Sequence, residues 1–158
     1  MYKLFVFIMG SIIGSFLNVC IYRLPKGESI IFPSSHCPKC KKNILWHDNI
    51  PILSYLALLG RCRYCKTRIA FRYFLVELVT ALLSLLLFSY FGLNIKFFAY
   101  AVLIYALIIA TFVDFEIQEI PDEISLGGIV VGLIVAAIFP GLFDSAAHFK
   151  SLLGSCLA

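Results

Sequence analysis

Two cysteine pairs of the form Cys-x-x-Cys carry the clearest chemical signal in this sequence. The pairs are Cys37 with Cys40 and Cys62 with Cys65, and 21 residues separate them. Each pair places two sulfurs on one tight turn, so two such turns supply the four thiolates of a tetrahedral zinc site. Lysine and arginine side chains around both pairs favour thiolate over thiol. A closed four-cysteine site has no open coordination position, so we expect it to fold the loop and not to catalyse a reaction.

Two other states of these cysteines stay open from the sequence, namely two disulfides or free thiols. A reducing compartment disfavours structural disulfides, which makes zinc the favoured interpretation. The other two cysteines, Cys20 and Cys156, lie in apolar segments and are interpreted as small packing residues.

Asp114 is the second candidate for chemistry, because it ends a long apolar run and opens an acidic segment. An acid at the edge of a membrane segment is by default a candidate functional residue, so we take Asp114 as one. The alternative is that Asp114 only marks a helix end. Asp122, which follows Pro121, is interpreted as the N-cap of the next helix. Glu77 has two open interpretations: an interfacial neighbour of Arg72, or a buried acid with a partner or ligand role.

The composition of the chain predicts that membrane helices position these residues. Hydrophobic residues make up 61% of the chain and charged residues 14%, and the mean hydropathy is +0.97. So little polar surface cannot cover a soluble globule of this size. A helix of about 20 apolar residues crosses a bilayer, and such stretches lie at 4–22, 74–91, 97–113 and 124–143. The sequence therefore predicts an all-α polytopic membrane protein with about four transmembrane helices and the start of a fifth near Ser151.

The distribution of charge predicts the orientation of these helices. Ten of the 13 Lys and Arg residues lie between 23 and 72, together with only two acids. By the positive-inside rule this segment is a cytoplasmic loop, and Asp114 returns to the same side. We therefore expect a first transmembrane helix (1–22), a cytoplasmic basic loop with the cysteine pairs (23–72) and a transmembrane domain (73–158). The simpler alternative is that the basic loop is only a topology signal that contacts anionic lipid.

Small residues form one face of the first predicted helix. They are Gly10, Ser11, Gly14 and Ser15, and they let another helix approach closely. Asn18 lies one turn further on and is placed to form a hydrogen bond across that contact.

Several motifs together resemble type IV prepilin peptidases, aspartic peptidase family A24. The segment that starts at Asp114 (114–122) is similar to the first aspartate motif of that family. The resemblance runs from about Gly10 to Leu126, which is most of the chain. The other motifs that carry it are, in chain order, 14–25, the two Cys-x-x-Cys pairs, 49–56 and 72–78.

The resemblance implies a bifunctional enzyme of the bacterial inner membrane. Such enzymes cleave the leader of prepilins or pseudopilins on the cytoplasmic side, and N-methylate the new N-terminus with S-adenosylmethionine. Two aspartates would share the activation of water, and Asp114 matches the first of them. The second belongs to a Gly-x-Gly-Asp motif that does not occur before Ala158. We therefore expect this chain to be an incomplete, peptidase-inactive fragment, in which the residues that bind the methyl donor are unassigned.

Two functions from other classes remain open. The first is a non-catalytic membrane adaptor whose zinc loop binds a secretion or pilus-assembly partner. The second is a membrane-anchored zinc module that recognises anionic lipid or nucleic acid. The loop has few aromatic residues suited to base stacking beyond Trp46 and Tyr64, which argues against nucleic acid. The expected partners are therefore a prepilin or pseudopilin substrate and membrane lipid, with no nucleic acid.

Overall fold

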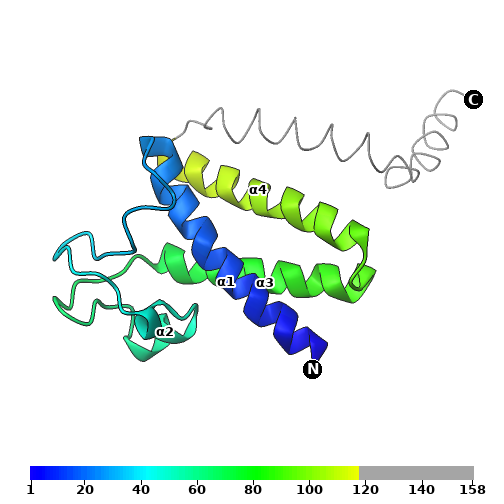
Figure 1. Ribbon diagram of the computed structural model, residues 1–158, viewed down its shortest axis with the longest axis horizontal. Coiled ribbons are helices and arrows are strands. Elements are labelled where there is room, and N and C mark those ends of the chain that lie inside the picture. Colours follow the sequence, from blue (N-terminus) through cyan, green and yellow to red (C-terminus); the bar gives the residue numbers. More distant parts are fainter. Residues whose placement is uncertain (118–158) are drawn as a thin grey trace, which may run out of the picture. The chain divides into compact units, whose positions relative to one another are not determined.

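The computed structural model describes residues 1–117, and every structural statement below concerns this part of the chain. The predicted span at 124–143, Asp122, Cys156 and the segment from Ser151 lie outside the described residues. The described part is helical and holds no β-strand beyond two isolated bridges. Its elements, shown in Figure 1, are α1 (Tyr2–Arg23), η1 (Leu24–Lys26), η2 (Trp46–Asn49), α2 (Leu53–Ala57), α3 (Phe71–Phe91) and α4 (Ile95–Ile117).

Three of these helices are long and apolar enough to cross a membrane. Their mean hydropathies are 2.3, 2.1 and 2.1. Large apolar side chains remain exposed on their outer surfaces, for example Leu86 of α3 at 52% and Leu107 of α4 at 55%. Such surfaces suit a lipid environment, in which the helix satisfies its own backbone groups. The predicted all-α membrane class is thus confirmed for the described part, with candidate spans Tyr2–Lys26, Phe71–Phe91 and Ile95–Phe115.

α1 and α3 pack closely along the small-residue face of α1, and Figure 1 shows the two helices crossing. A Cβ atom placed on Gly14 would lie 2.7 Å from the Cα of Glu77. A Cβ atom placed on Gly10 would lie 2.9 Å from the Cα of Ala81. Since real Cβ atoms do not approach backbone this closely, glycine is required at both positions. The predicted role of Gly10 and Gly14 is confirmed.

Polar side chains are buried in this helix contact and are joined by hydrogen bonds. Asn18 of α1 donates from Nδ2 to the carbonyl of Tyr73 in α3, at 3.0 Å, as its position on α1 predicted. The hydroxyl oxygens of Ser84 in α3 and Tyr105 in α4 lie 2.7 Å apart. The hydrophobic effect does not drive helices together within lipid. Interhelical hydrogen bonds of this kind therefore help to determine which helices pack against each other.

A short turn reverses the chain between α3 and α4. Gly92 ends α3 with a positive φ of 62°, and the carbonyl of Asn94 accepts a hydrogen bond from the N–H of Phe97 in the first turn of α4. α4 therefore runs antiparallel to α3. Asp114, close to the end of α4, returns to the end of the bundle where α1 ends and α3 begins (Figure 1). The loop that contains the cysteine pairs leaves the bundle at this same end.

Candidate metal centre

The four cysteines of the loop converge on one point. The Sγ atoms of Cys37, Cys40, Cys62 and Cys65 all lie within 4.8 Å of one another. The Sγ atoms of Cys37 and Cys65 are 3.7 Å apart. A tetrahedral four-thiolate zinc site with bonds of about 2.3 Å requires a sulfur separation of about 3.8 Å, whereas a disulfide requires about 2.05 Å. The geometry fits a metal ion such as zinc, and these four cysteines form no disulfide.

The two cysteine turns have the same backbone hydrogen bonds. In each turn the N–H of the first cysteine donates to the carbonyl five residues on, and the N–H four residues on donates to that cysteine's own carbonyl. The two distances are 3.0 and 2.9 Å around Cys37, and 2.9 and 3.0 Å around Cys62. Lys41 and Lys66 occupy equivalent positions with positive φ angles of 59° and 56°. The loop therefore contains a structural repeat at an interval of 25 residues.

The repeat extends to the residues on either side of each turn. An isolated bridge joins His36 to Asn43 in the first turn, and another joins Arg61 to Arg68 in the second. The bonds that close the two turns, from Ile44 N–H to Ser35 and from Ile69 N–H to Gly60, are 2.9 and 2.7 Å long. Two equivalent turns each contribute two thiols to one site. Sequence analysis missed this repeat, although the equal spacing of Cys37 from Cys62 and of Ile44 from Ile69 was a usable signal.

The protein environment shifts the pKa values of Cys37 and Cys65 in opposite directions. Desolvation opposes ionisation of Cys37, but hydrogen bonds from the backbone of Cys40 and Lys39 and from neighbouring thiols outweigh it and lower its pKa to about 6. A backbone hydrogen bond at Thr67 favours the thiolate of Cys65, but desolvation and the neighbouring thiols raise its pKa to about 11. Cys37 is therefore the thiol that ionises more readily. A bound cation would keep all four sulfurs in the thiolate form at the same time.

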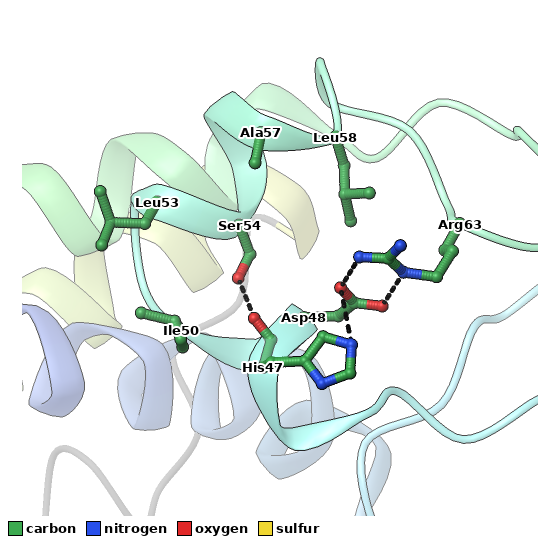
Figure 2. Close-up of a pocket in the computed structure, with 8 residues that line it drawn as sticks. All are labelled: His47, Asp48, Ile50, Leu53, Ser54, Ala57, Leu58 and Arg63. Carbon is green, nitrogen blue, oxygen red and sulfur yellow. Dashed lines mark hydrogen bonds and ion pairs between the residues drawn. The ribbon is translucent and has the colours of Figure 1, made fainter.

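An ion pair connects the second cysteine turn to η2, as Figure 2 shows. Arg63 lies between Cys62 and Cys65 and donates from Nε and Nη2 to the carboxylate of Asp48, at 2.7 and 2.6 Å. The side chain of Asp48 is only 7% exposed. The hydrogen bonds from Arg63 hold the pKa of Asp48 below its usual value.

This ion pair lies at an open pocket of about 210 Å³ (Figure 2). Ser54 donates from its hydroxyl to the carbonyl of His47 at 3.0 Å across the same region. Arg63 and Asp48 neutralise each other, and four of the other six lining residues are apolar. The residues that line it are His47, Asp48, Ile50, Leu53, Ser54, Ala57, Leu58 and Arg63.

Glu77 connects the loop to the membrane helices. It is buried in α3, at 9% exposure, and its Oε2 accepts a hydrogen bond of 2.7 Å from the N–H of Ile52. Ile52 has a φ of 63° and a ψ of −55°, a conformation that a β-branched residue rarely adopts. Surrounding contacts must therefore impose this conformation. The structure shows Glu77 as a buried acid, and the backbone N–H of Ile52, which sequence analysis did not identify, is one of its partners.

Asp114 lies apart from this polar contact but at the same end of the bundle. Its side chain is exposed, and α4 continues through it to Ile117, so that Asp114 occupies the last two turns of the helix. The aspartate is accessible where the loop leaves the bundle. The acidic segment beyond it lies outside the described residues.

These features define a class of protein: an α-helical membrane protein with a four-thiol cluster, suited to a metal ion, in the loop between its first two spans, and with an exposed aspartate at the same end. Residues 8–91 match the family model described as the bacterial peptidase A24 N-terminal domain. The chain belongs to this family.

Proteins of known name support the same assignment. The chain is 39% identical to the prepilin leader peptidase/N-methyltransferase of Myxococcus xanthus (strain DK1622), over 99% of this chain and 46% of that protein. It is 42% identical to the type 4 prepilin-like proteins leader peptide-processing enzyme of Escherichia coli O78:H11, over 80% of this chain and 54% of that protein. It is 35% identical to the prepilin leader peptidase/N-methyltransferase of Pseudomonas aeruginosa (PAO1), over 92% of this chain and 60% of that protein.

The chain is shorter than these relatives. It spans about half the length of the curated relatives that it matches. No solved structure matches it.

Proposed function

We propose that this chain is the N-terminal part of a membrane aspartic endopeptidase that removes the leader of prepilins or pseudopilins and N-methylates the new N-terminus. The observation that carries the proposal is the position of Asp114, which is exposed at the end of the bundle where the cysteine loop leaves it. The names of the relatives in Myxococcus xanthus and Pseudomonas aeruginosa support both activities.

In this proposal Asp114 is one of two catalytic carboxylates. Two neighbouring carboxylates that share a proton divide the work of base and acid toward the tetrahedral intermediate of peptide hydrolysis. The second would come from a Gly-x-Gly-Asp motif, which this sequence does not contain. The chain alone is therefore expected to lack peptidase activity.

The proposed location is the bacterial inner membrane, with the basic loop (23–72) and Asp114 on the cytoplasmic side. Ten Lys and Arg residues in the loop support this orientation through the positive-inside rule. The antiparallel course of α3 and α4 supports a common side for the loop and the aspartate. A leader with basic residues that stays in the cytoplasm would then reach Asp114 without crossing the membrane.

We assign the cysteine loop a structural zinc ion and no catalytic step. Cys37, Cys40, Cys62 and Cys65 would hold the ion, which supplies a fixed tetrahedral link between the two equivalent turns. S-adenosylmethionine is the proposed methyl donor, and its binding residues are unassigned.

The experiment compares this chain with a protein that extends it to the length of its relatives, both in liposomes with a prepilin substrate. The proposal predicts leader cleavage by the extended protein and none by the 158-residue chain. Methyl transfer to a substrate that is already cleaved is followed in the same samples. Cleavage by the chain alone would contradict the two-carboxylate assignment, and absence of cleavage by the extended protein would contradict the peptidase assignment.

A further inference from the structure

One stretch of the loop differs from the rest because it carries no charge. No Asp, Glu, Lys or Arg occurs between Asp48 and Arg61, although the loop as a whole is strongly basic. The stretch contains α2 and exposes three leucines: Leu53 at 64%, Leu56 at 55% and Leu59 at 84%. Contiguous exposed apolar residues of this kind mark an interaction surface.

The opposite face of α2 is packed against the start of α3. The ring of Tyr55 lies 5.3 Å from the ring of Phe74 and 6.4 Å from that of Phe71, measured between centroids. The N–H of Ile52 donates to the buried carboxylate of Glu77. These contacts hold α2 against α3, while Leu53, Leu56 and Leu59 stay largely exposed. Leu53 also lines the pocket beside η2.

The contact with Glu77 also fixes the depth of α2. Glu77 is the seventh residue of α3, so its Cα lies about 9 Å along the axis from Phe71 at a rise of about 1.5 Å per residue. Its side chain leans back toward the start of the helix, which places the carboxylate about one turn inside that end. The 21 residues of α3 span about 31 Å, which matches a hydrocarbon core of about 30 Å. α2 therefore lies beside the first turns of α3 and not beyond the end of that helix.

Charges around this stretch complement a lipid surface. Exposed Arg61 lies two residues after Leu59, and Arg68 is joined to it by the bridge of the second cysteine turn. Lys66, at the tip of that turn, is also exposed. Apolar residues at acyl depth with basic residues beside them form the pattern of an interfacial membrane anchor.

We propose that the stretch around α2 is inserted into the lipid leaflet at the loop end of the bundle, with Leu53, Leu56 and Leu59 among the acyl chains and the basic second cysteine turn at the headgroups. The occupant of the leucine surface is phospholipid. This anchor holds the metal loop against the membrane surface, close to the end of α4 that carries Asp114. The proposal depends on the membrane position of α3 and is independent of the peptidase assignment.

The test uses tryptophan fluorescence, because Trp46 is the only tryptophan in the sequence. In a Trp46→Phe background, Leu56→Trp places the single fluorophore on the leucine surface, at a position exposed enough to accept a larger ring. Leu86→Trp on the outer surface of α3 serves as the control within the membrane, and Lys39→Trp in the first cysteine turn as the control in water. Each protein is reconstituted in liposomes that contain anionic lipid, with bromine atoms placed high or low on the acyl chains.

We expect Leu56→Trp to lose most of its fluorescence to bromines high on the acyl chain and to be shielded from acrylamide in the water. Leu86→Trp should be quenched more by deeper bromines, and Lys39→Trp by acrylamide alone. Quenching of Leu56→Trp by acrylamide and not by brominated lipid would place α2 in water and overturn the proposal. Shielding from both quenchers would mean that a protein surface covers α2, either a second copy or another partner, and would also overturn it.

Discussion

At the scale of the residue, the four thiols are the groups at which the two equivalent turns of the loop meet. Removing one leaves a site with three ligands and opens the link between the turns. We expect Cys62→Ser to lose stoichiometric zinc, measured by metal analysis of the purified protein, and to become more sensitive to proteolysis between the two turns.

The matched control for this change is Cys20→Ser. Cys20 is buried in α1, outside the four-thiol cluster. It should keep the full complement of zinc. Retention of zinc by Cys62→Ser, or loss of zinc by Cys20→Ser, would contradict the assignment of the metal centre.

Asp48 allows a prediction about pH. Its pKa is lowered in the folded protein by the hydrogen bonds from Arg63, so the ion pair contributes stability above the unfolded pKa and loses it as the pH falls through the folded value. The difference in unfolding free energy between wild type and Asp48→Asn is measured for both proteins without metal, so that loss of metal at low pH does not contribute. This difference should be constant near neutrality. It should shrink toward zero below about pH 3.9, the ordinary value for aspartate.

A double-mutant cycle tests whether this difference in unfolding free energy arises from the interaction between Asp48 and Arg63. Asp48→Asn and Arg63→Gln should each destabilise the loop, and the double variant should be little worse than either single variant. Additive losses would mean that the two side chains act independently.

At the scale of the element, the contact between α1 and α3 depends on glycine. Any side chain at Gly14 meets the backbone of α3 at Glu77. Overpacking costs about 1–3 kcal/mol where side chains can adjust, and we expect Gly14→Leu to reach at least the upper end of that range because backbone cannot. Resistance to unfolding in detergent measures the effect.

Phe16→Leu is the control on the outer surface of α1, where the side chain is 50% exposed. It should leave the unfolding transition nearly unchanged. Equal stability of the Gly14 and Phe16 variants would show that the two helices do not pack as described.

The link between Glu77 and Ile52 joins two elements, since it holds α2 against α3. Glu77→Ala removes the acceptor of the Ile52 N–H, whereas Glu77→Gln keeps a side-chain carbonyl at the same distance from the backbone. We expect Glu77→Ala to raise hydrogen exchange at residues 50–58 strongly, and Glu77→Gln to raise it much less. Equal exchange in the wild type and Glu77→Ala would show that the bond does not hold the loop.

At the scale of the whole molecule, the parts that could be predicted from sequence are those set by local composition. Hydropathy over about 20 residues predicted the three described spans, and the structure extends each by a few residues, for example from 97–113 to Ile95–Ile117. The spacing of the cysteines predicted their cluster, because two short turns are enough to form such a site.

The features that sequence analysis missed depend on contacts between distant segments. The N–H of Ile52 is a backbone group without a signature in the sequence, and Glu77 lies 25 positions further along the chain. The left-handed conformation of Lys41 and Lys66 follows from closure of the turns and not from the lysine side chain. The depth of α2 likewise appears only once α3 and the loop are placed together.

The arrangement of the whole bundle brings the cysteine loop and Asp114 to one end, although 48 residues of sequence lie between Cys65 and Asp114. The family relationship gives this end its proposed chemistry. The central claim is that Asp114 is a catalytic carboxylate on an accessible helix end.

The most direct test is the rate of prepilin leader cleavage by the extended protein with Asp114→Ala, compared with Glu116→Ala, which removes a neighbouring acid. We expect Asp114→Ala to lower the rate by at least about 10²-fold, the lower end of what general acid–base groups contribute. Zinc content and methyl transfer to a substrate that is already cleaved should be retained, and Glu116→Ala should cleave at nearly the normal rate. Cleavage by Asp114→Ala at the rate of the unchanged protein would contradict the account and leave Asp114 as a helix-end residue only.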